Sequence, residues 1–173
     1  ELITRARALA NAGDGDGADG LLQLAASLAP ESGEALMLRG NLAAYVFKPA
    51  RLVEAEAHYL AALEAEPTRW ETHYFLGRLL VDTRQFERAS AVLGRAAELN
   101  ATNAAVHELH AAAHAGAGSF DGAAAAYLAS AALDRHVPSP YHSLARAALR
   151  LGRPADAVAA LRQLVDRFPW HAG

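Results

Sequence analysis

Small and apolar residues recur along this chain with a constant step. Alanine stands at Ala55, Ala89, Ala123 and Ala157, with 34 residues from each alanine to the next. Around these positions, apolar residues follow the i, i+3, i+4, i+7 spacing that places them on one face of an α-helix. A period of this size is typical of stacked helix pairs, because one pair cannot bury its apolar face without its neighbours. The pattern therefore predicts an all-α fold of repeated antiparallel helix pairs.

The register of this period divides the chain into four full repeats and one truncated repeat, which together form a single array over residues 1–173. In one upstream repeat the first helix begins three residues early. We therefore expect an enlarged turn near Pro49, where proline would break a helix. The predicted repeats are 1–32 (truncated), 33–69 (with a three-residue insertion), 70–103, 104–137 and 138–171.

The residues that keep the register resemble the tetratricopeptide repeat family. The repeat over residues 70–103 carries its pattern most clearly, in Leu76-Gly77, Phe86, Ala89, Leu93 and Ala96. The resemblance implies a right-handed superhelical solenoid, whose first helices line a concave groove. It also implies that a peptide or a partner protein binds in that groove.

Composition and charge narrow the possible functions. Hydrophobic residues make up 53% of the chain and charged residues 20%, which is too apolar for a disordered protein. The net charge of −3 argues against binding to a nucleic-acid backbone, which requires a basic excess. Cysteine is absent, so disulfides and thiolate metal sites are excluded. No apolar run approaches the length of a membrane span, and the compartment, cytoplasmic or exported, stays open.

Catalytic motifs are missing from the sequence. No serine lies in a nucleophile-elbow motif, and no glycine-rich loop follows a strand. We therefore expect a module that is not an enzyme and needs no cofactor.

Three histidines form the most conspicuous local cluster. His107, His110 and His114 are spaced by three and four residues, which places their rings on one helical face and is compatible with zinc binding. The same positions are the apolar seam of the other repeats, where Leu76 is the equivalent of His110. Since seam residues face the second helix of their own pair, the register favours neutral core histidines. We assign no metal ligand, and a zinc site or a pH-responsive core remains the alternative.

A run of glycine and aspartate covers residues 13–20. An EF-hand loop that began at Asp14 would need an oxygen ligand at Ala18 and a glycine at Asp19, and both positions differ. The register places this run between two helices, where glycine and aspartate commonly reverse the chain. We expect a turn here.

The groove-lining offsets of the family fall on polar and aromatic residues of the first helices. The candidate partner-binding residues are Asn41, Tyr45, Tyr74, Arg78, Glu108, His142, Arg146 and Arg150. The resemblance implies that Asn41 holds a bound peptide backbone. His142, Arg146 and Arg150 step by four residues and form a basic stripe that suits an acidic side chain or a chain-terminal carboxylate. A solvated charged face is the alternative.

The last predicted helix, residues 154–167, carries apolar residues on its outer face, and no polar cap follows Trp170. This end therefore suggests a further repeat, an attached domain or self-association.

Taken together, these features favour a non-catalytic module whose groove binds a protein or peptide. We expect that partner to carry an acidic segment or chain terminus. The alternatives are the substrate-recruiting arm of a larger enzyme, such as a glycosyl- or other group-transferase, and a self-assembling scaffold.

Overall fold

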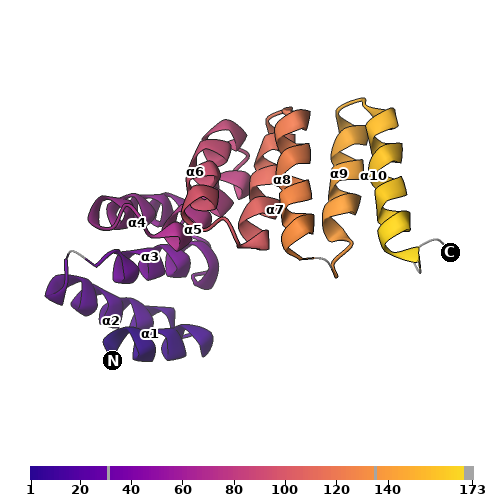
Figure 1. Cartoon of the computed structure of the whole chain (residues 1–173). Helices are drawn as coiled ribbons and strands as arrows, with labels where there is room; N and C mark the ends of the chain where they lie inside the picture. The colour runs from indigo at the N-terminus through magenta and orange to yellow at the C-terminus, as the bar shows by residue number, and fades with distance from the viewer. Residues whose placement is uncertain (31, 135, 170–173) are drawn as a thin grey trace. The chain divides into compact units, whose positions relative to one another are not determined.

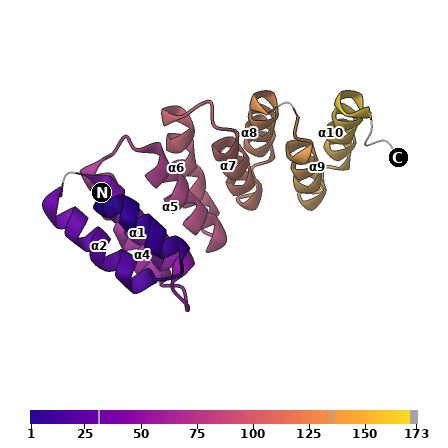
Figure 2. The ribbon, with the colours of Figure 1, turned by 90° about the horizontal axis from the view of Figure 1, so that it is seen from below.

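The computed structural model describes residues 1–30, 32–134 and 136–169. In these residues the chain forms ten α-helices and one π-helical turn, and it forms no strand. Within each unit, consecutive helices joined by short turns pack as pairs: α1 with α2, α3 with α4, α7 with α8 and α9 with α10 (Figure 1, Figure 2). The predicted all-α class is confirmed. Trp170 and His171, the last two residues of the predicted repeat 138–171, lie outside the described residues.

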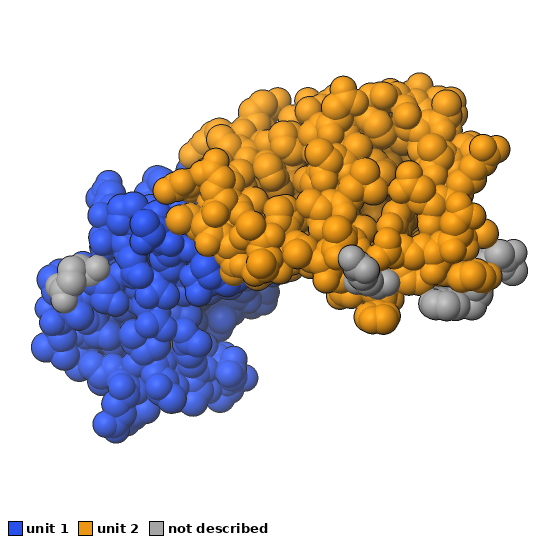
Figure 3. Space-filling view, in the orientation of Figure 1, with its two compact units in different colours: residues 1–79 blue, residues 80–173 orange. Residues whose placement is uncertain are grey.

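The chain divides into two compact units, residues 1–79 and 80–173, which Figure 3 colours separately. None of the helices in the described ranges is both long and apolar enough to cross a membrane.

Unit 1 contains the first two helix pairs and most of a fifth helix. Its elements are α1 (Leu2–Asn11), α2 (Gly15–Leu28), α3 (Gly33–Asn41), the π-helical turn η1 (Leu42–Val46), α4 (Leu52–Ala65) and the larger part of α5 (Trp70–Asp82). Ala6, Ala18, Leu22 and Leu42 are at most 3% exposed and pack together in its core. Small residues at two of these positions let the helices approach closely.

The turn between α1 and α2 is shorter than the glycine and aspartate pattern predicts. Residues 12–14 form the turn, with Gly13 at a φ of 85°, and α2 begins at Gly15. The side chain of Asp14 accepts a 2.9 Å hydrogen bond from the backbone N–H of Gly17, which satisfies a free donor of the first helical turn. The predicted turn therefore covers only the start of the run, because Asp14 acts as a helix N-cap.

The segment around Pro49 departs from regular helix. After α3, the chain continues as η1, and a loop at residues 47–51 leads into α4. The backbone N–H of Phe47 donates to Leu42 O, and that of Arg51 donates to Ala43 O at 2.8 Å. The guanidinium of Arg51 lies 4.0 Å from the centre of the Phe47 ring. Backbone bonds and this cation–π contact together hold the loop in place.

Unit 2 contains α6 (Phe86–Leu99), α7 (Ala104–Gly116), α8 (Phe120–Leu133), α9 (Ser139–Arg150) and α10 (Pro154–Arg167). One core cluster of this unit joins α7, α8, α9 and α10 and includes Ala123, Tyr127, Leu144 and Ala157. The alanines of the 34-residue step are all buried, with exposed fractions of at most 2%. Their small side chains stand where neighbouring helices meet.

Candidate partner-binding site

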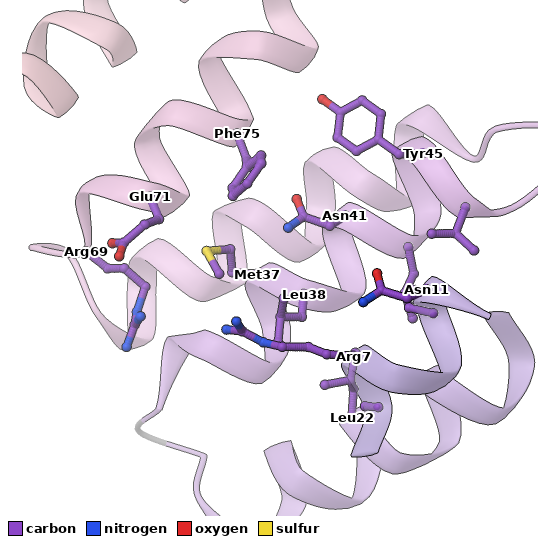
Figure 4. Close-up of a pocket in the computed structure, with 14 residues that line it drawn as sticks. Arg7, Asn11, Leu22, Met37, Leu38, Asn41, Tyr45, Arg69, Glu71 and Phe75 are labelled. Atoms are coloured by element: carbon purple, nitrogen blue, oxygen red, sulfur yellow. The ribbon is translucent and has the colours of Figure 1, made fainter. Parts of the chain in front are cut away.

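A pocket of about 550 Å³ opens in unit 1 between α1, α3, η1 and α5 (Figure 4). Apolar side chains form much of its lining, among them Leu22, Met37, Leu42 and Phe75. Asn41 and Tyr45, two of the residues predicted for partner binding, also line it. The pocket therefore combines an apolar surface with a few polar groups, as ligand sites commonly do.

Asn41 is held by a neighbour from α4. The hydroxyl of Tyr59, which is 0% exposed, donates a 2.7 Å hydrogen bond to Oδ1 of Asn41. With its oxygen occupied in this way, the amide keeps Nδ2 as a donor on the pocket side, and Figure 4 shows the side chain directed into the pocket. Burial raises the pKa of Tyr59, with a further rise from Tyr45 and an opposing effect of Arg78. The phenol therefore stays neutral and remains a hydrogen-bond donor.

Arg78 of α5 contacts the ring of Tyr45, which lines the pocket. The guanidinium carbon of Arg78 lies 4.9 Å from the centre of the Tyr45 ring, within the range of a cation–π contact. Arg78 is exposed, so its charge remains accessible to solvent. Asn41, Tyr45 and Arg78 thus lie in one part of unit 1. The buried Tyr59 bonds to Asn41, and both Tyr45 and Arg78 affect its pKa.

Tyr74 lies beside the pocket in an aromatic cluster on α5. Its ring centre is 5.4 Å from that of Phe75 and 6.4 Å from that of Trp70, both in edge-on arrangements. Phe75 in turn stacks with Tyr59, at 6.5 Å and an interplanar angle of 9°. Phe75 is a pocket residue that the sequence pattern does not single out, because the groove offsets of the family point to its neighbour Tyr74.

The first helix supplies pocket residues that the pattern also misses. Arg7 and Asn11 of α1 line the pocket, and Arg7 Nη2 forms a 2.7 Å ion pair with Oε1 of Glu34. Arg69 and Glu71 lie at another part of the rim (Figure 4). α1 has only ten residues and belongs to the truncated repeat. Its sequence pattern is therefore too short to indicate which of its residues face the pocket.

In unit 2, three of the predicted residues, Glu108, Arg146 and Arg150, affect the ionisation of Tyr127 in α8. Burial raises the pKa of Tyr127, Glu108 adds to the rise, and Arg146, a hydrogen bond with Ser143 and Arg150 oppose it. In the sequence, Tyr127 occupies an apolar core position, so the pattern does not indicate that its hydroxyl interacts with polar and charged groups.

The predicted basic stripe occupies the exposed side of α9. His142, Arg146 and Arg150 are exposed, whereas the residues between them are mostly buried. Glu108 is engaged elsewhere, since its Oε1 accepts a 3.0 Å hydrogen bond from the hydroxyl of Ser139. Across residues 1–30, 32–134 and 136–169, neither Arg146 nor Arg150 forms an ion pair with a carboxylate.

The histidine cluster splits into two parts. The rings of His110 and His114 have centres 4.5 Å apart and are tilted by 37° to one another, and both lie within 3.5 Å of the hydroxyl of Ser90 in α6. His107 instead contacts the carbonyl of Ala101 at 2.9 Å. The register predicts that these histidines face the second helix of their own pair. In the structure, His110 and His114 also contact α6, which belongs to the preceding pair.

Burial lowers the pKa of His110 to about 4, with further lowering by His114 and then His107, and burial also lowers the pKa of His114. Both rings are therefore neutral at pH 7. No group of three or more His, Asp or Glu side chains in the described residues is arranged to hold a metal ion.

Two family models match the chain, both described as tetratricopeptide repeat, over residues 48–113 and 138–169. No curated protein matches it. Among solved structures, MamA from Desulfovibrio magneticus RS-1 (residues 41 to the end) has a TM-score of 0.80 at 16% identity, covering 99% of this chain and 96% of that chain.

A second solved MamA structure has a TM-score of 0.81 at 20% identity, over 96% of this chain and 89% of that chain. YrrB, described as a TPR protein with an unusual peptide-binding site, has a TM-score of 0.79 at 24% identity, over 97% of this chain and 85% of that chain. At these identities, the similarity concerns the fold.

Proposed function

Because the chain belongs to the tetratricopeptide repeat family, we propose that it is a non-catalytic module that binds a protein or peptide partner. The observation that carries this proposal is the pocket of unit 1, where an apolar surface adjoins an oriented amide. The peptide-binding site named for YrrB, which shares the fold, supports the same class of function.

The pocket suits a large apolar side chain of the partner. Its volume of about 550 Å³ and its lining by Met37, Leu42 and Phe75 favour an aliphatic or aromatic group as the anchor. Anchors of this kind usually supply much of the binding energy, because they leave water completely. The adjoining Tyr45 and Tyr74 add aromatic surface for the residues on either side of the anchor.

Asn41 is proposed to bind the partner's main chain. Its Oδ1 is already bonded to Tyr59, so Nδ2 donates to a peptide carbonyl. The Tyr59 bond limits rotation of the amide, which lowers the entropy lost when a peptide binds. Arg78, exposed over the Tyr45 ring, offers a cation at the same site.

The basic stripe of unit 2 is proposed as a separate contact for an acidic group. Arg146 and Arg150 are exposed, four residues apart on one helix and not paired with a carboxylate in the described residues. Arginine forks bind carboxylates with two hydrogen bonds, so an acidic side chain or a terminal carboxylate fits this surface. Glu108 of α7, which accepts a hydrogen bond from Ser139 of α9, is a negatively charged neighbour of this helix.

A displayed peptide library, selected on the full chain, tests this function. Peptides that bind should share an apolar anchor residue, and their affinity should fall by about tenfold or more in the pocket-filling variant Ala10→Phe. Ala10 lines the pocket and is partly exposed, so thermal melting can verify that the variant is folded. Arg95→Ala, at an exposed position of α6, is the control and should bind as the wild type does.

The two proposed contacts are separable in the same assay. The Arg146→Ala/Arg150→Ala variant should lose affinity for selected peptides that carry acidic residues and keep affinity for those that carry none. Undiminished affinity of every peptide for Ala10→Phe would refute the pocket, and undiminished affinity of acidic peptides for the double variant would refute the stripe.

A further inference from the structure

The outer face of α10 carries an uncovered apolar stripe. Val158, Leu161 and Val165 are 48%, 40% and 40% exposed. Their spacings of three and four residues place them in one row along the helix. Arg162 and Asp166 border the same surface.

The equivalent positions one repeat earlier are covered by protein. Subtracting the 34-residue step takes Leu161 to Tyr127, which is 6% exposed, and Val165 to Ala131, which is 2% exposed. There, α9 packs against α8. In the described residues, α9 is the helix that packs extensively on α10, and none covers its outer face. This face thus has the pattern that accepts a helix elsewhere in the unit.

Charge makes the face complementary to itself. Arg162 and Asp166 are exposed and one helical turn apart, and neither forms an ion pair within the described parts of the chain. A face that carries one cation and one anion beside an apolar row is neutral overall. Two such faces related by a two-fold axis can pair the cation of each with the anion of the other.

We propose that two copies of this chain associate through α10, with the two helices antiparallel across a two-fold axis. The apolar rows of Val158, Leu161 and Val165 pack together, and Arg162 of each copy pairs with Asp166 of the other. The interface goes beyond partner binding, because it uses a different surface from the pocket of unit 1.

The size of the face determines how strong this association is. One helix face is smaller than a standard protein interface, so the dimer belongs to the weak and concentration-dependent class. Exposed ion pairs contribute little energy but they fix the orientation in which two faces meet. The apolar row therefore supplies the affinity, and the charges select the antiparallel arrangement.

Sedimentation equilibrium on the full chain, from low micromolar to about millimolar concentration, measures this association. The wild type should approach twice the monomer mass and no more, and Leu161→Glu should remain a monomer. Leu128→Glu is the matched control, since Leu128 is also 40% exposed but lies on α8, and it should dimerise as the wild type does. Circular dichroism verifies that each variant is folded.

A charge exchange tests the pairing itself. R162D and D166R should each weaken self-association by about tenfold, because each places like charges opposite one another. A mixture of the two single variants should form a heterodimer, in which both contacts again join opposite charges. The double variant R162D/D166R should also recover.

Three results would overturn the proposal: a wild-type monomer at all concentrations, growth beyond a dimer, or no recovery in the mixture. None of them bears on peptide binding by the pocket, which is measured separately.

Discussion

The hydroxyl of Tyr59 donates a 2.7 Å hydrogen bond to Oδ1 of Asn41, and this bond joins the buried core of unit 1 to its pocket. Tyr59 is 0% exposed and comes from α4, whereas Asn41 ends α3 and lines the pocket. The relationship gives one side chain two roles. Tyr59 fills the core between the helices, and its hydroxyl orients the amide that we propose binds the partner.

Removing this hydroxyl should affect both stability and binding. We expect Tyr59→Phe to lower the free energy of unfolding by about 1 kcal/mol, the usual net value of such a bond. Affinity for selected peptides should also fall, because the amide of Asn41 is then free to rotate. Urea unfolding and calorimetric titration measure the two effects. Equal affinity of wild type and variant would show that orientation of Asn41 is irrelevant to binding.

The close contact between Gly40 and Tyr59 should not tolerate a larger residue. A Cβ on Gly40 would lie 2.5 Å from Cε1 of the Tyr59 ring, so the buried ring would have to move. Gly40→Ala should therefore cost about 1–3 kcal/mol of stability. Gly20→Ala is the control, because Gly20 lies in α2 with nothing within 4 Å of the added Cβ, and it should gain about 0.5–1 kcal/mol. Stabilisation by both substitutions would contradict the close contact.

Stability should fall in acid because of the histidines between α6 and α7. Burial lowers the pKa of His110 to about 4, and burial also lowers the pKa of His114. The unfolded chain, in which histidine titrates near 6.5, then binds more protons than the folded chain between about pH 6.5 and 4. The contribution is fully present above pH 6.5 and is lost as the pH falls through this window.

His110→Leu isolates that effect, since leucine occupies the equivalent positions 76 and 144. The difference in unfolding free energy between wild type and variant should shift in favour of the variant as the pH drops from 7.5 to 5. All other groups titrate in both proteins, so they largely cancel. Parallel pH profiles would mean that His110 is not buried as described.

The sequence predicts the positions of the helices better than it predicts the irregular segments between them. The 34-residue register predicts a last helix at 154–167, and α10 has these bounds. Helical periodicity is a local property, so it is visible in a single sequence. The register also predicts a disturbance near Pro49, but it holds no information on the π-helical form of residues 42–46, which depends on how the three additional residues are accommodated.

The candidate site was predictable only in part. Asn41 and Tyr45 follow from the family's groove offsets and line the pocket, whereas Phe75 does not follow from them. Tyr59 and Tyr127 occupy the same position in their repeats and read as apolar core residues. Their hydroxyls nevertheless engage different helices, since Tyr59 bonds to α3 of its own pair and Tyr127 to Ser143 of the next. Contacts between repeats depend on how the helices pack, which no local pattern encodes.

Met37 allows the proposed binding site to be observed directly. It is the single methionine of the chain and it lines the pocket of unit 1. Labelling with ¹³C-methyl methionine therefore gives one NMR signal, which reports on this pocket alone. Arg95→Ala again serves as a control that leaves the pocket unchanged.

A titration of the labelled chain with a selected peptide is the most direct test of partner binding in this pocket. The Met37 methyl signal should shift and saturate at the same peptide concentrations as calorimetric binding, and in Ala10→Phe the same peptide should cause a much smaller shift. A peptide that binds the wild type with full calorimetric saturation while the Met37 signal stays unchanged would contradict the proposal that the pocket of unit 1 holds the partner.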